Sequence, residues 1–222
     1  VPCFYYKGVN KHLLPSVNGN SKKYLSKLLN LVKKKRIEKL IPLSDHDLFI
    51  LSKNRIKFEK LGCHVIISKF DFVRMCLNKK KMHEYCLKKK INTPNSFFQK
   101  TDAKLKLPLL KKRIFGSGSV DMEIIKNRSE FKNLNFNKFF LQEKIFGTEY
   151  GIDIFNDPEK YFSRICVKKK LIMRAGETDR SLVITDNKIK KFAENLIKIF
   201  GHYGNIDCDV IKDKSNKLYL LD

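Results

Sequence analysis

Hydrophobic residues alternate between two spacings in the first third of the chain. Apolar positions recur at helical spacing over 21–36 and 45–61, and each of these helices is expected to be capped by the polar residue that begins it. Short, continuously apolar runs at 39–43 and 64–68 are typical of buried strands. Helices that alternate with such strands predict a small parallel α/β unit.

The pattern changes after Thr93-Pro94, where strand-like runs dominate. Helices are predicted over 71–77, 79–89 and 186–200, the last capped by Asp186. The expected strands cover residues 107–112, 122–126, 139–145, 150–155, 161–167, 205–211 and 217–222. The predicted fold class is therefore α/β followed by α+β.

The net charge is +24, from 47 basic and 23 acidic residues, which allows a basic nucleic-acid-binding module as one function. The basic residues are 39 Lys against 8 Arg, beside 17 Asn, a profile that A/T-rich codons also produce. The lysine runs are scattered and carry no interleaved aromatic residues. Codon bias is therefore the favoured interpretation, and no nucleic-acid partner is expected.

No apolar run approaches the roughly 18 residues that a membrane span needs, so no membrane partner is expected. The six cysteines form no C-x-x-C pair, which is typical of reduced cysteines in a cytoplasmic protein. The chain begins Val1-Pro2 without an initiator methionine and stops at Asp222 inside a strand-like run. We therefore expect a fragment of a longer protein.

Three motifs could carry chemistry. The glycine loop, residues 116–119 (Gly-Ser-Gly-Ser), follows a strand containing Lys111, and its small residues would let backbone N–H groups approach a phosphate. It matches neither a P-loop nor a nucleophile elbow, and a plain hairpin turn is the alternative. Glu143 and Glu149 flank a second turn, which could equally be an ordinary charged hairpin.

The third motif is a pair of acids, Asp207 and Asp222, on the last two predicted strands. A polar turn at 213–216 joins these strands, so they should pair antiparallel. Facing carboxylates would repel each other unless a divalent cation lay between them, and oxygen ligands suit Mg²⁺. Two isolated surface acids are the alternative.

The order of these motifs resembles the ATP-grasp family, on the branch of the carbamoyl-phosphate synthase large subunit. The segments that carry the resemblance are Asn78-Lys79, Ile91-Asn92-Thr93-Pro94, Pro108 to Arg113 with the glycine loop, Gln142 to Tyr150, and Met173 to Thr178. Asn78 and Lys112 depart from the usual Asp and Pro, and the family's Asn-Pro-Arg after the last acid is not in this sequence.

The resemblance implies a partial Rossmann-like preATP-grasp domain over 1–75, without its first strand, and an ATP-grasp domain of two subdomains over 76–222, with 95–145 as the lid that clamps ATP. It implies the following roles. Lys79, Lys111 and the loop residues Gly116, Ser117, Gly118 and Ser119 would contact the phosphates; Glu143, Lys144 and Phe146 would hold the adenine; Glu149 would accept from the ribose hydroxyls; Asp207 and Asp222 would bind Mg²⁺. Arg164 and Arg174 fall between the nucleotide motifs and the last strands, and a planar guanidinium group suits a carboxylate or a phosphate, so both are candidate catalytic residues. Solvated charges on a strand are the alternative.

The activity implied is that of an ATP- and Mg²⁺-dependent ligase forming C–N bonds. It would activate a small-molecule carboxylate as an acylphosphate for attack by an amine or a similar nucleophile. A fragment of a carbamoyl-phosphate synthase large subunit and a basic nucleic-acid-binding module are the alternatives. A homodimer is one expectation for its assembly.

Overall fold

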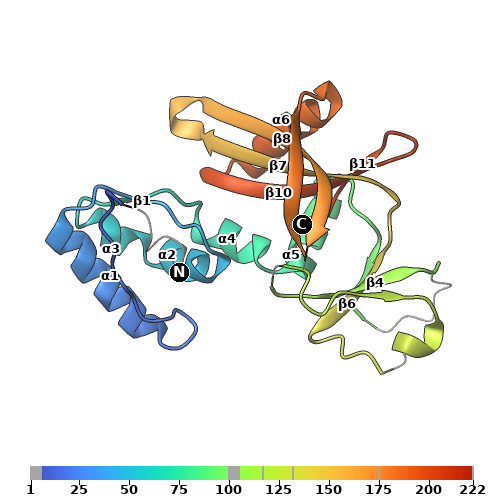
Figure 1. Ribbon diagram of the computed structural model, residues 1–222, viewed down its shortest axis with the longest axis horizontal. Helices are drawn as coiled ribbons and strands as arrows, with labels where there is room; N and C mark the ends of the chain where they lie inside the picture. The colour runs from blue at the N-terminus through green and yellow to red at the C-terminus, as the bar shows by residue number, and fades with distance from the viewer. Residues whose placement is uncertain (1–6, 100–105, 117, 132, 175, 222) are drawn as a thin grey trace. The chain divides into compact units, whose positions relative to one another are not determined.

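The structure is a computed structural model that describes residues 7–99, 106–116, 118–131, 133–174 and 176–221 (Figure 1). The chain divides into two compact units, residues 1–67 and 68–222. The sequence-based boundary after residue 75 lies farther along the chain, and it stays a prediction.

The first unit is a small α/β layer, as its pattern predicts. Its two strands pair in parallel, Lys39 with His64 and Leu40 with Val65. Its elements are α1 (Ser21–Lys35), β1 (Lys39–Leu40), α2 (Asp45–Lys53), α3 (Arg55–Glu59) and β2 (His64–Val65).

Three local predictions for this unit are wrong. The helix caps lie one residue earlier than expected, because Asn20 accepts a hydrogen bond from the Lys23 N–H and Ser44 caps α2. The helix expected over 45–61 is interrupted at Asn54. The apolar run 39–43 is not a buried strand throughout, since the side chain of its last residue is 93% exposed and the strand ends at residue 40.

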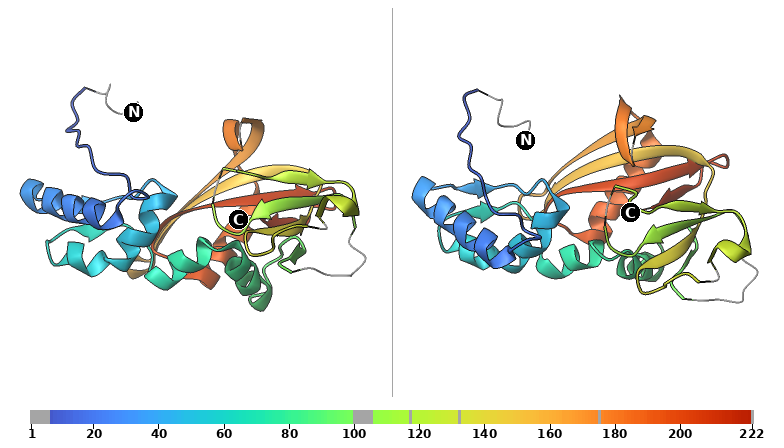
Figure 2. Two further views of the ribbon diagram at one scale, coloured as in Figure 1. Left: turned by 90° about the horizontal axis from the view of Figure 1, so that it is seen from below. Right: turned by 60° about the horizontal axis from the view of Figure 1, so that its bottom comes forward.

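The second unit contains helices on one side of a five-stranded sheet, together with a smaller four-stranded sheet (Figures 1 and 2). Its helices are α4 (Phe70–Cys76), α5 (Lys79–Lys88) and α6 (Asn187–Phe200). Its strands are β3 (Ser96–Phe97), β4 (Leu109–Arg113), β5 (Glu123–Ile125), β6 (Phe139–Glu143), β7 (Gly147–Asp157), β8 (Phe162–Arg174), β9 (Glu177–Ile184), β10 (Gly204–Asp213) and β11 (Leu218–Leu220).

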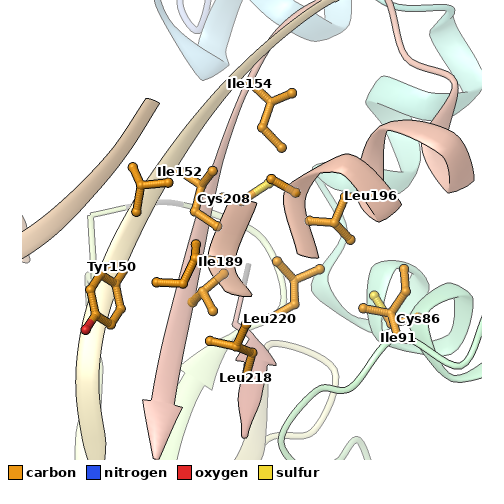
Figure 3. Packing of buried hydrophobic residues seen from close by; sticks show 13 residues of the cluster. Cys86, Ile91, Tyr150, Ile152, Ile154, Ile189, Leu196, Cys208, Leu218 and Leu220 are labelled. Atoms are coloured by element: carbon orange, nitrogen blue, oxygen red, sulfur yellow. The ribbon is translucent and has the colours of Figure 1, made fainter. Parts of the chain in front are cut away.

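The five-stranded sheet has the order β11-β10-β7-β8-β9, and all its strands pair antiparallel. One face packs on α6 and α5 and forms the main hydrophobic core (Figure 3). Ile189, Ala193 and Leu196 of α6 are fully buried there, which confirms the helical periodicity predicted over 186–200. The antiparallel pairing of β10 with β11 is also as predicted.

The four-stranded sheet, with the order β3-β6-β4-β5, lies within the lid subdomain expected over 95–145. Its core is small and is built from Leu109, Ile125 and Leu141. Strand β4 pairs antiparallel with both β5 and β6, so the glycine loop joins two neighbouring strands. None of the described helices combines the length and apolar character that crossing a bilayer requires.

Candidate active site

The side chains of strand β7 alternate between an apolar face and a polar face of the large sheet. Tyr150, Ile152 and Ile154 are buried in the core, and successive side chains of a strand point to opposite faces. Glu149 and Asp153 therefore belong to the face that α5 and α6 leave uncovered. The turn predicted beside Glu149 thus leads into a strand that places Glu149 and Asp153 on the polar face.

Strand β10 adds two carboxylates to this polar face. Asp207 and Asp209 alternate with buried core residues, and the β10–β7 register places Asp207 opposite Asp153. Burial raises the pKa of Asp207 above its ordinary value, Lys168 opposes the rise, and Asp153 and Asp209 add to it. The two neighbouring carboxylates therefore disfavour the ionised form of Asp207, and a cation beside it would favour that form.

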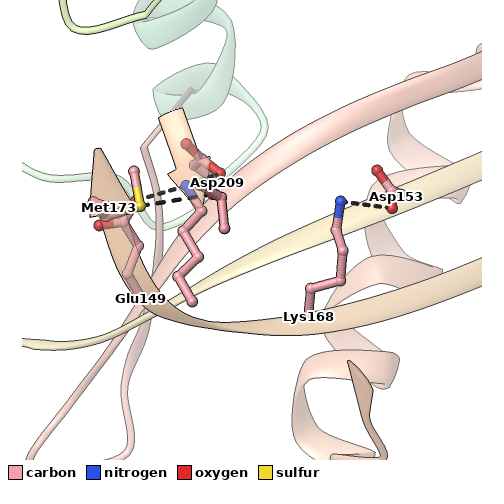
Figure 4. A network of polar contacts seen from close by, with 7 residues as sticks. Glu149, Asp153, Lys168, Met173 and Asp209 are labelled. Carbon is pink, nitrogen blue, oxygen red and sulfur yellow. Dashed lines mark hydrogen bonds and ion pairs between the residues drawn. The ribbon is translucent and has the colours of Figure 1, made fainter. Parts of the chain in front are cut away.

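Two lysines of β8 lie among these acids. Lys170 Nζ donates to Glu149 Oε1 at 2.8 Å and lies 2.6 Å from Asp209 Oδ1. Lys168 Nζ lies 2.7 Å from Asp153 Oδ2. Figure 4 shows Glu149 and Asp209 close together and the Lys168–Asp153 pair farther along the strands. Each lysine thus pairs with carboxylates of other strands and not with a carboxylate of its own strand.

We call this surface the acidic face. It consists of Glu149, Asp153, Asp207 and Asp209 together with Lys168 and Lys170. Its four carboxylates and two ammonium groups leave a formal charge of −2, the charge that one divalent cation would balance. Carboxylate oxygens are the donors that Mg²⁺ prefers.

The fit to Mg²⁺ rests on Asp207. Within the part of the chain that the structure describes, no three His, Cys, Asp or Glu side chains are already gathered around one possible ion position. Asp222, the other predicted ligand, lies outside the described residues. The oxygen donors and the charge fit the ion, and Asp207 is the predicted ligand whose surroundings the structure shows.

A pocket of about 390 Å³ lies where the adenine was predicted. Glu143, Lys144 and Phe146 all line it, and the Lys144 ammonium lies 5.3 Å from the centre of the Phe146 ring. The Glu143 carboxylate accepts a 2.8 Å hydrogen bond from the Asn95 side chain. The opposite part of the lining comes from the β10–β11 turn and from Tyr219 on β11.

The two lysines predicted to contact phosphates lie on different elements. Lys111 on β4 pairs with Glu123 at 2.6 Å, and its side chain is only 16% exposed. Lys79 begins α5, and its backbone N–H donates to the Ile114 carbonyl. A phosphate bound by Lys111 would have to compete with the Glu123 carboxylate.

The glycine loop turns between β4 and β5, and an ion pair between Arg113 and Asp121 closes its base. Gly116, Gly118 and Ser119 are described, whereas Ser117 lies outside the described residues. The loop is thus held at its base, and its two described glycines supply backbone groups without side chains.

The two arginines predicted to recognise substrate lie far apart. Arg164 lies near the start of β8, 4.4 Å from the centre of the Phe162 ring. Arg174 ends the same strand and pairs with Asp179 at 2.9 Å. Ten residues of strand correspond to about 30 Å, so the two guanidinium groups do not converge on one substrate group.

Four polar residues of the acidic face were missed by the sequence analysis: Asp153, Lys168, Lys170 and Asp209. A signal was present, because Lys168 and Lys170, like Asp207 and Asp209, are two positions apart and so share a face of any strand. Tyr219 of the pocket was missed as well, and nothing in its sequence context marks it.

Family models match both parts of the chain. The model of the ATP-grasp domain matches residues 76–222, and that of the PylC-like N-terminal domain matches residues 9–66. A search of curated protein sequences found no match. The resemblance to the ATP-grasp family and the predicted fold class are both confirmed.

Solved structures share the fold at low sequence identity. The L-amino acid ligase of Bacillus licheniformis is 17% identical with a TM-score of 0.71, over 93% of this chain and 53% of that one. The biotin carboxylase domain of Hydrogenobacter thermophilus 2-oxoglutarate carboxylase, in complex with MgADP, ADP and bicarbonate, is 16% identical with a TM-score of 0.67, over 89% and 50%. The VanG D-Ala:D-Ser ligase of Enterococcus faecalis is 16% identical with a TM-score of 0.64, over 82% and 62%.

This chain spans between half and two thirds of the length of these three proteins. The family model covers both sheets of the second unit, because it runs from residue 76 to residue 222. The chain belongs to the ATP-grasp family.

Proposed function

We propose that this chain is the nucleotide-binding part of an ATP- and Mg²⁺-dependent ligase that activates a carboxylate as an acylphosphate for attack by an amine or a similar nucleophile. The observation that carries the proposal is the continuity of residues 143–149. They line the pocket at Glu143, Lys144 and Phe146 and reach the acidic face at Glu149, three residues after Phe146. A nucleotide with its base in the pocket would direct its ribose and phosphates toward that face.

Each group of residues has a definable task in this reaction. The backbone and side chains of 143–146 bind and orient the base, and Glu149 accepts from the ribose hydroxyls. Lys111 and Lys79 bring positive charge to the phosphates, and backbone N–H groups of the glycine loop exclude water from them. Asp207, together with Asp222, would hold Mg²⁺, which when bound offsets the charge of the transferring phosphoryl group.

No protein nucleophile is required in this scheme, so binding geometry and electrostatics carry the rate. The branch similar to carbamoyl-phosphate synthase is part of the proposal. Its support is the segment from Met173 to Thr178, whose two ends belong to β8 and β9 and pair with each other, Met173 with Thr178 and Arg174 with Glu177. A fragment of such a synthase remains the second candidate on the same observation.

The first test is MgATP binding by calorimetry. Lys111→Ala should weaken binding by about 1.5–3 kcal/mol, because a charged hydrogen bond is lost. The matched control is Lys126→Ala, at an exposed lysine of the same subdomain, which should leave the affinity unchanged. Equal affinity for all three proteins would remove Lys111 from the site.

The second test asks for the chemistry. The protein is incubated with MgATP, hydroxylamine and a panel of carboxylates, and hydroxamate formation is measured, since hydroxylamine intercepts an acylphosphate. Hydroxamate that depends on one carboxylate would name the substrate. Phosphate release that every carboxylate leaves unchanged, without hydroxamate, would contradict a carboxylate ligase.

A further inference from the structure

Lys170 is a largely buried lysine that lies between two carboxylates. Its ammonium group lies 2.8 Å from Glu149 Oε1 on β7 and 2.6 Å from Asp209 Oδ1 on β10, and its side chain is only 7% exposed. A buried ammonium group loses much of its hydration, and only well-placed carboxylates offset that cost. The position therefore depends on both partners at once.

The sheet is shaped to allow this contact. Strand β7 lies between β8 and β10, so Lys170 must cross β7 to reach Asp209. It does so beside Gly151, where a Cβ atom would lie 3.7 Å from Lys170 Cε and 3.4 Å from Lys168 Cε. Both distances are ordinary van der Waals contacts, so the two lysine side chains pass directly over the backbone at Gly151.

Charge explains what the contact does. With Lys170 in place the acidic face carries a formal charge of −2, and without it the same face would carry −3, with Glu149 and Asp209 next to each other. A net charge of −3 on a face of oxygen donors would attract a free divalent cation strongly.

We propose that Lys170 is an internal counter-ion that keeps divalent cations off the acidic face while no nucleotide is bound, and that positions Glu149 and Asp209 for the nucleotide. The second half of this inference rests on the proposed ATP site, whereas the first half concerns the nucleotide-free protein alone. A metal ion would then bind together with the triphosphate of the nucleotide. The negative charge of the triphosphate would replace the carboxylate charge that Lys170 neutralises.

The test is a titration of the nucleotide-free protein with Mn²⁺, followed by the electron paramagnetic resonance signal of the free ion. Lys170→Met should bind Mn²⁺ about tenfold more tightly than the unaltered protein, because one positive charge has left the face. Lys170→Arg, which keeps the charge, should bind as the unaltered protein does.

Lys169→Met is the matched control. It makes the same change in total charge one residue away, on the opposite face of β8, where Lys169 lies opposite Tyr150 in the β7–β8 register. Its Mn²⁺ affinity should stay that of the unaltered protein. Equal Mn²⁺ affinity in Lys170→Met and Lys169→Met would overturn the proposal.

Folding gives a second readout, since Lys170→Met removes the ammonium group that Glu149 and Asp209 share. A Lys170→Met protein that folds only when Mn²⁺ is added would support the proposal, and one that stays unfolded at saturating Mn²⁺ would overturn it. Failure of the proposed function is distinguishable: the unaltered protein would then not bind ATP, whereas the Mn²⁺ titration uses no nucleotide.

Discussion

The backbone of Gly176, at the tip of the β8–β9 hairpin, lies directly against that of Gly118 in the glycine loop, so that a Cβ atom on Gly176 would overlap the Gly118 carbonyl oxygen. Gly176 also has a φ of +83°, a conformation that residues with side chains rarely adopt. The hairpin tip and the loop predicted to cover the phosphates thus meet closely, with the Gly118 carbonyl group and the Ser119 Cβ atom nearest to Gly176.

Replacing Gly176 with Ala should separate these two segments, because the obstacle is backbone rather than a flexible side chain. We expect faster hydrogen exchange in the peptide covering 115–121 and weaker MgATP binding. Gly62→Ala is the control: Gly62 has a φ of +76°, but its Cβ atom would meet nothing within 4 Å. Unchanged exchange at 115–121 in Gly176→Ala would show that the contact does not order the loop.

Tyr219 should contribute to nucleotide affinity through its ring. It lines the pocket opposite Glu143 to Phe146, and the Lys217 ammonium lies 4.9 Å from the ring centre. Tyr219→Ala should weaken ATP binding by about 1 kcal/mol, the usual value of an aromatic pair beyond its burial. Tyr219→Phe should retain the affinity, as should Tyr161→Ala at a tyrosine that is 98% exposed. Calorimetry measures all three, and a loss as large in Tyr219→Phe would assign the effect to the hydroxyl group.

Asp186 links the start of α6 to strand β10. Its Oδ1 accepts from the N–H groups of Lys188 and Ile189 at 3.0 and 3.1 Å, and its Oδ2 accepts from Lys212 Nζ at 2.7 Å. Asp186→Ala should lower the free energy of unfolding by about 1–2 kcal/mol, and Asp186→Asn by less, because an amide oxygen still caps the helix. Urea denaturation measures both.

The same residue predicts a pH dependence. The Lys212 ammonium is the largest cause that lowers the pKa of Asp186 from its ordinary 3.8. Because the folded-state pKa is the lower one, the stabilisation is complete above pH 3.8 and is lost as the pH falls through the folded-state pKa. The stability difference between the unaltered protein and Asp186→Asn should therefore shrink in acid, and a constant difference would exclude the ion pair as its source.

His202 should destabilise the fold at mildly acidic pH. It is 2% exposed, stacks on Phe72 with ring centres 6.0 Å apart, and burial lowers its pKa from 6.5. The unfolded chain therefore takes up a proton below pH 6.5 before the folded chain does, so stability falls as the pH falls. His202→Phe should reduce the difference between urea midpoints at about pH 7.5 and about pH 5.5. The exposed His46→Gln should leave that difference as it is.

Elements whose apolar side chains repeat at regular spacing could be predicted from the sequence, whereas exposed elements could not. Helix α6 was found because its apolar side chains repeat on one buried face. Strand β9 was missed because it lies at the edge of the sheet, and seven of its eight residues, including Leu182 and Val183, are exposed. An edge strand is specified by its neighbour's hydrogen bonds, which the local sequence does not contain.

Some residues of the candidate site could likewise be predicted from the sequence, and others could not. Glu143 and Asp207 were identified from the order of short motifs, and the structure places them in a pocket and on a polar face. The contact of Lys170 with Asp209 could not be foreseen, since it depends on β7 lying between β8 and β10. Strand order is a property of the whole fold.

Strand β10 also makes mispairing during folding costly. It alternates Asp207 and Asp209 with Cys208 and Val210, so a slip of one residue against β7 would turn the two carboxylates toward Leu196 and expose the apolar pair. The slipped arrangement would bury two charges in a hydrocarbon environment without a cation. The carboxylates that give the sheet its polar face thus also disfavour the wrong strand register while the sheet assembles.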